Sequence, residues 1–141
     1  MAWKIIKNTS GSGREAFEGV RISRTPKGGR KGKPRGDSVR IRIGAKLCET
    51  YRLLVGDRVY PSFDAESRLG RVSRTNERDG YTASSGGAKR DPAHFQQVVV
   101  SFSVSDDDMR VIFPNNEKVY VAASADATSE GIVFSLARKH E

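Results

Sequence analysis

The chain has 141 residues, 36% hydrophobic and 30% charged, which suffices for one modest core and is not polar enough for a wholly disordered chain. Its longest apolar run is only a few residues and its N-terminus has no apolar core segment, so we expect neither a membrane-spanning helix nor a secretory signal. The single cysteine, Cys48, excludes an internal disulfide and a cysteine zinc cage. We expect it to be a small buried side chain in a cytoplasmic protein.

The net charge of +8 is concentrated in one segment. Residues 20–42 carry nine basic side chains against one acidic residue, Asp37, whereas the basic and acidic residues of the remaining chain balance. A localised basic excess is the electrostatic footprint of a protein that binds a polyanion. We therefore expect nucleic acid as the partner, with duplex DNA favoured. The candidate nucleic-acid-binding residues are Arg21, Arg24, Lys27, Arg30, Lys31, Lys33, Arg35, Arg40 and Arg42.

The N-terminal part, residues 1–19, is predicted to be a short strand at residues 3–6 followed by a linker rich in Gly and Ser. Residues 11–16 superficially match a dinucleotide-binding glycine pattern. Because no adequate helix or parallel strand follows, we interpret them as linker.

Two segments, Val20–Arg24 and Val39–Ile43, alternate apolar and polar residues with a period of two, as half-buried strands do. If they pair, their apolar residues face a core, and Arg21, Arg40 and Arg42 share the opposite face. Arginine offers a rigid donor fork to phosphates and base edges, and the major groove of DNA admits a two-stranded ribbon. The Gly-, Pro- and Lys/Arg-rich loop at residues 25–38 is predicted to be extended and mobile.

Apolar side chains at spacings of four and three predict a short helix within residues 44–54. After a Gly-Asp turn, strands are predicted at residues 58–60 and 69–74. Residues 75–92, rich in Gly, Ser, Asp and Arg, are predicted to be a flexible loop.

The C-terminal part, residues 93–141, is predicted to be an antiparallel β lobe. Asp106–Asp108 are interpreted as a solvated turn or helix cap rather than a cation site, because no further carboxylate cluster lies nearby in the sequence. The predicted strands cover residues 98–104, 109–113, 118–122 and 131–136.

The run Ser38–Leu47, followed by Tyr51, Leu53 and Val55–Val59, resembles the AbrB/MazE-type swapped-hairpin domain of bacterial transition-state regulators and antitoxins. In that family a strand runs into a short helix with leucine-like residues at fixed intervals, and a Gly-Asp turn leads into the next strand. The resemblance covers about residues 20–74. It implies an interleaved homodimer whose first hairpin and loops touch DNA. That role carries over to Arg21, Arg24, Arg40 and Arg42.

The sequence thus predicts a mainly β protein with one short helix, in which a swapped-hairpin-like β unit at residues 20–74 precedes the C-terminal lobe. We expect a DNA-binding transcriptional regulator that uses a basic β-ribbon and a flexible arm. Two alternatives stay open. One is a small protein-interaction module that inhibits or modulates a nucleic-acid-handling enzyme, of mobile-element or phage type. The other is an RNA-associated basic protein.

We do not expect an enzyme. With one cysteine, Cys48, and two peripheral histidines, His94 and His140, the chain offers few candidates for a nucleophilic triad. No cofactor and no metal site are predicted.

Overall fold

The computed structural model describes residues 19–25, 38–86 and 94–138. The predicted N-terminal strand and linker, His140, and the basic loop with Lys27, Arg30, Lys31, Lys33 and Arg35 lie outside these ranges.

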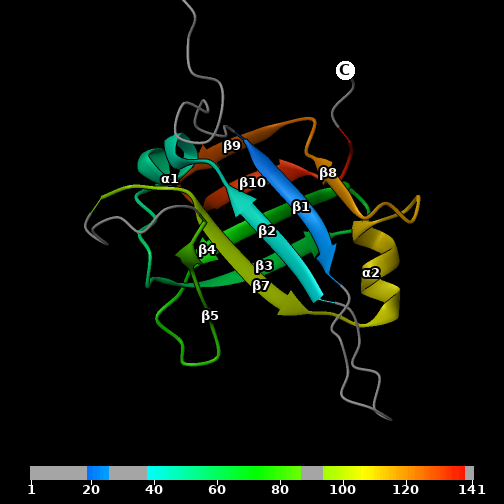
Figure 1. Ribbon diagram of the computed structural model, residues 1–141, viewed down its shortest axis with the longest axis horizontal. Coiled ribbons are helices and arrows are strands. Elements are labelled where there is room, and N and C mark those ends of the chain that lie inside the picture. The colour runs from blue at the N-terminus through cyan, green and yellow to red at the C-terminus, as the bar shows by residue number, and fades with distance from the viewer. Residues whose placement is uncertain (1–18, 26–37, 87–93, 139–141) are drawn as a thin grey trace, which may run out of the picture.

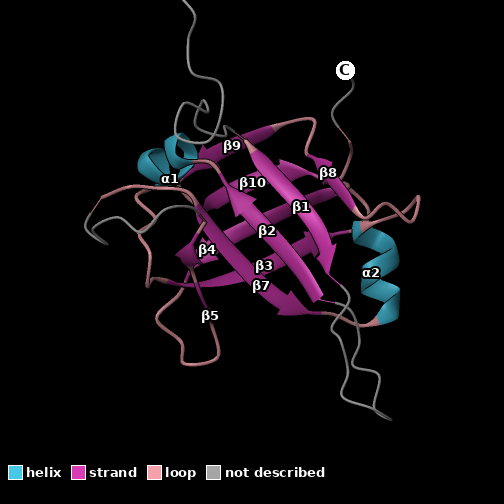
Figure 2. Cartoon of the chain, in the orientation of Figure 1, coloured by secondary structure: helices cyan, strands magenta, loops and turns pink. Residues whose placement is uncertain are grey.

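The described chain forms two five-stranded antiparallel sheets (Figures 1 and 2). This confirms the predicted mainly β class. Sheet A has the strand order β6-β7-β2-β1-β8, with β1 at Val20–Thr25, β2 at Ser38–Ile43, β6 at Ser84–Ser85, β7 at Val98–Ser103 and β8 at Val119–Val121. Sheet B has the order β5-β3-β4-β10-β9, with β3 at Arg58–Asp64, β4 at Leu69–Arg74, β5 at Tyr81–Thr82, β9 at Ala125–Thr128 and β10 at Gly131–Ser135.

Each sheet is built around a hairpin from the first half of the chain. The β1–β2 hairpin pairs with β8 on one edge and with β7 on the other, and the β3–β4 hairpin is extended by β10 and β9. An isolated hairpin is only marginally stable in water, so these additional strands supply the pairing and the apolar face that it lacks. The described parts of segments 20–74 and 93–141 therefore share both sheets and one hydrophobic core.

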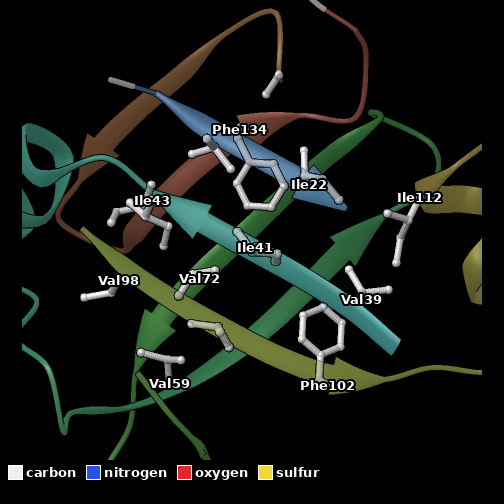
Figure 3. Close-up of a cluster of buried hydrophobic side chains, with 14 of the residues drawn as sticks. Ile22, Val39, Ile41, Ile43, Val59, Val72, Val98, Phe102, Ile112 and Phe134 are labelled. Atoms are coloured by element: carbon white, nitrogen blue, oxygen red, sulfur yellow. The ribbon is translucent and has the colours of Figure 1, made fainter. Parts of the chain in front are cut away.

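The core lies between the two sheets (Figure 3). All five apolar residues of the predicted ribbon are fully buried, which confirms the inward face of the β1–β2 hairpin. They are Val20, Ile22, Val39, Ile41 and Ile43. From the opposite sheet, Phe134 lies over Gly70, where an added Cβ would come within 2.5 Å of the ring. The sheet can therefore hold Phe134 in this position only because residue 70 has no side chain.

The predicted short helix is confirmed as α1, Ala45–Tyr51. It ends at Arg52, whose left-handed backbone (φ 64°) lets its N–H donate to the last carbonyls of the helix. The helix packs against β9 and β10 and buries Cys48. No helix in the described ranges is long and apolar enough to cross a membrane.

A second helix, α2 at Asp106–Ile112, corrects the prediction of one helix and of a strand at residues 109–113. The Ser105 hydroxyl accepts a hydrogen bond from the Asp108 N–H at 3.2 Å, and three aspartates occupy the first turn. Both features stabilise a helix N-terminus. Met109 and Ile112, three residues apart, then bury one helical face. A capping signal thus outweighs a short apolar run.

The predicted loop at residues 75–92 is also corrected where the structure describes it. It contains β5, which pairs with β3, and β6, which pairs with β7. These two short strands form one edge of sheet B and one edge of sheet A.

Candidate nucleic-acid interface

Three arginines of the β1–β2 hairpin share the outer face of sheet A. Arg21 is the register partner of Arg42, and Arg40 is the register partner of Ser23. Because successive strand residues point to opposite faces, these side chains lie opposite the buried valines and isoleucines. Arg21 and Arg40 are exposed and Arg42 is half-buried. The predicted grouping of Arg21, Arg40 and Arg42 is confirmed.

Arg24 does not join this group. It has the same strand parity as Val20 and Ile22, so its side chain starts from the inner face, at the end of β1. There its Nη1 donates a hydrogen bond to Oδ1 of Asn116 at 3.0 Å. The structure therefore brings together three of the four hairpin arginines named above.

The neighbours of the three arginines on this face are short side chains. The guanidinium groups therefore reach farther from the sheet than the residues beside them. One row across the sheet consists of Val121, Arg21, Arg42 and Val99, and the next of Val119, Ser23, Arg40 and Ser101.

No acidic residue occurs in any of the five strands of sheet A. Within the described ranges, Arg40 and Arg42 form no salt bridge. Like charges directly opposite each other on paired strands are destabilising, so placing Arg21 opposite Arg42 opposes folding. No carboxylate on the strands of sheet A therefore competes with an anion for the guanidinium groups of Arg40 and Arg42.

The outer face of sheet B has a different character. Its central row includes Arg71, opposite Ser62 and Val133, and then Asp126. Arg71 also lies 3.6 Å from the carboxylate of Glu130. Charges of both signs are mixed there. Among the described strands, an outer face with arginines and no acidic residue is therefore specific to sheet A.

The arginine face, defined here as the outer surface around Arg21, Arg40 and Arg42, is not covered by either described helix. Figure 1 shows α1 and α2 at opposite ends of the sheets, with β7, β2 and β1 toward the viewer. Thr25 and Ser38 are register partners, so the basic segment 26–37 starts and ends at one end of the hairpin.

Sequence reasoning did not find a second pair of arginines, Arg58 and Arg74, which line an open depression of about 620 Å³. Only the pairing of β3 with β4, the strands that carry Arg58 and Arg74, indicates that these two residues lie together. Arg74 already has local partners: its Nη1 donates to the Arg52 carbonyl at 3.1 Å, and its guanidinium lies 5.0 Å from the centre of the Tyr51 ring. Because this cation stabilises the junction of α1 and β4, the arginine face is the stronger candidate.

Cys48 is fully buried, as its sequence context predicted. Its Sγ donates to the Ile43 carbonyl at 3.8 Å, and burial raises the pKa of the thiol to about 12. The thiolate that a nucleophile requires is therefore strongly disfavoured at neutral pH. Among the residues that the structure describes, no group of three or more His, Cys, Asp or Glu side chains is arranged to hold a metal ion.

No protein-family model, curated protein or solved structure matches this chain.

Proposed function

We propose that the protein binds nucleic acid through the arginine face of sheet A. The observation that supports the proposal is the gathering of Arg21, Arg40 and Arg42 on one surface whose five strands contain no acid. Guanidinium groups held at fixed spacing on strands are suited to phosphate oxygens, which they can contact in a bidentate manner.

The basic segment 26–37 extends this proposal along the chain. Its two ends join the paired residues Thr25 and Ser38, so its five basic residues belong to the connection between β1 and β2. Lysines and arginines in such a segment would add sequence-independent contacts to phosphates.

The finer proposal is a DNA-binding transcriptional regulator of the AbrB-like, swapped-hairpin type. The supporting observations are the β1–β2 hairpin, the short helix α1 and the Gly56-Asp57 turn into β3, which follow one another in the order that the resemblance implies.

Self-association is a separate part of the proposal. The resemblance implies an interleaved homodimer, whereas β7 and β8 already pair with both edges of the hairpin within one chain. Sedimentation equilibrium at high micromolar concentration tests this point. A dimer supports the family's assembly. A monomer would indicate that β7 and β8 take the place of the second protomer.

The binding proposal is tested by titrating duplex DNA, single-stranded DNA and duplex RNA at several salt concentrations. The double variant Arg40→Gln/Arg42→Gln removes two charges from the arginine face. Arg71→Gln/Arg110→Gln is the matched control, because it removes two charges that are paired with Glu130 and Asp107 elsewhere.

We expect the first variant to weaken binding at least about tenfold and to make the slope of log affinity against log salt shallower by about 2 units. The control should bind like wild type. If both variants and wild type bind every nucleic acid equally weakly, the proposal is wrong. A pull-down from nuclease-treated lysate would then test the protein-interaction alternative, and a clear preference for RNA would favour the RNA-associated alternative.

A further inference from the structure

We infer that the arginine face holds the phosphate backbone of a duplex and does not read base sequence. This inference rests on the proposed function and specifies how that surface binds.

Sheet A is wider than the major groove of a duplex. The β1–β2 hairpin is not a free two-stranded ribbon, because β8 flanks β1 and β7 flanks β2. With strands about 4.8 Å apart, the four strands from β7 to β8 span about 14 Å between their axes, before side chains are added. The major groove of B-form DNA is about 12 Å wide. The β1–β2 hairpin therefore cannot enter the major groove as a two-stranded ribbon, because it lies in the middle of the sheet.

The arginine face also lacks the side chains that insert between base steps or stack on bases. A wide sheet reaches bases through the minor groove by inserting residues such as Phe, Leu, Ile or Met between base steps. Single strands, in turn, are bound by stacking their bases on aromatic rings. Neither kind of residue occurs at an outward position of the four main strands. These positions hold Arg21, Ser23, Thr25, Ser38, Arg40, Arg42, Val99, Ser101, Ser103, Val119 and Val121.

The remaining partner for this face is the phosphate backbone. Arg40 and Arg42 lie two residues apart on one strand, about 6.7 Å along β2, and Arg21 lies on the neighbouring strand directly opposite Arg42. Ser101 places a hydroxyl beside Arg40, and serine hydroxyls commonly donate to phosphate oxygens. A duplex carries about one negative charge per 1.7 Å of axis, twice that of one strand, so a compact group of cations favours the duplex.

The experiment combines selection from a randomised duplex pool with direct titration. We expect no enriched consensus that depends on the arginine face: the ratio of the affinities for two unrelated duplexes should stay within about threefold of its wild-type value in Arg42→Ala. The matching single strand should bind about tenfold or more weakly. Arg42→Ala should weaken binding to every duplex by the same factor, with Arg71→Ala as the control. A preference for DNA duplexes or for RNA duplexes would identify the nucleic acid that supplies the phosphates, and either preference supports the inference.

An enriched consensus whose advantage over random sequence is lost in Arg42→Ala would overturn the inference. Single-stranded DNA bound as tightly as the duplex would also overturn it. A consensus that survives Arg42→Ala but is lost when the basic residues of segment 26–37 are neutralised would place base recognition in that segment and support the backbone role of the face. Failure to bind any nucleic acid at low salt is a different result, because it contradicts the proposed function itself.

Discussion

Arg21 and Arg42 are direct register partners on the same face of sheet A, so two like charges oppose each other where a neutral pair would stabilise the strands. We predict that Arg42→Thr raises the free energy of unfolding by about 0.2–1 kcal/mol at low salt, because threonine suits a strand and removes the repulsion. The gain should shrink at high salt, where exposed charges are screened. Thermal unfolding at two ionic strengths measures both effects.

Arg40→Thr is the matched control for this prediction, because Arg40 lies opposite Ser23. Its removal should give a smaller salt-dependent change in stability. Equal salt dependence of the two variants would show that the Arg21–Arg42 repulsion does not oppose folding. The residues that favour binding are thus expected to reduce stability.

Gly70→Ala should destabilise the protein by about 1–3 kcal/mol, because its Cβ would lie 2.5 Å from the Phe134 ring. Phe134→Leu removes the ring, so the double variant should be less destabilised than the sum of the two single variants. Urea unfolding of the four proteins gives this coupling free energy. Ser73→Ala, on the same strand, is the control, and additivity of the Gly70 and Phe134 substitutions would contradict the predicted contact.

Cys48 should make the folded protein less stable at alkaline pH. Burial raises the pKa of its thiol to about 12, from an ordinary value of 9.0. Between these values the unfolded chain releases the proton and the folded chain retains it, so the free energy of unfolding falls as pH rises, by about 1.4 kcal/mol per unit. Below pH 9 this dependence is absent.

The measurement is the difference in unfolding free energy between wild type and Cys48→Ala across this pH range, since other alkaline titrations are common to both proteins. A difference that does not change with pH would contradict the prediction. Thiol labelling at neutral pH should be slow in the folded protein and fast in denaturant, as burial requires.

Tyr120→Phe should cost about 1–3 kcal/mol, because the Tyr120 hydroxyl donates to the Ile112 carbonyl at 2.6 Å in a buried site and its loss leaves that acceptor unpaired. This bond joins the C-terminal end of α2 to β8. Burial also raises the pKa of the Tyr120 hydroxyl, so it remains a donor at all physiological pH values. Chemical denaturation measures the loss. Tyr81→Phe, at an exposed tyrosine on β5, should change stability by less than about 0.5 kcal/mol, and an equal loss in both variants would refute the assignment.

The alternation of residues 20–24 and 39–43 was sufficient to predict two strands, their inward residues and the common face of Arg21, Arg40 and Arg42. Side-chain direction along a strand is a local property with a period of two, so no distant contact is needed to infer it. The helix at Ala45–Tyr51 is local in the same sense. For α2, the local cap at Ser105 and the aspartates after it were the informative signal, and the apolar run from Met109 to Phe113 was misleading.

Only the tertiary structure decided what lies beside those elements. The pairing of Arg21 with Val121 joins residues 100 positions apart, and nothing in either segment specifies that partner. Because of the same long-range pairing, the predicted two-stranded ribbon forms the middle of a wide sheet. At the end of β1, Arg24 hydrogen-bonds to Asn116, which is also distant in the sequence. The sequence alone therefore determined the charge and the composition of the candidate face, because both follow from local spacing. Its width and its access to a groove were decided by strand pairing between distant segments, which depends on the burial of the whole core.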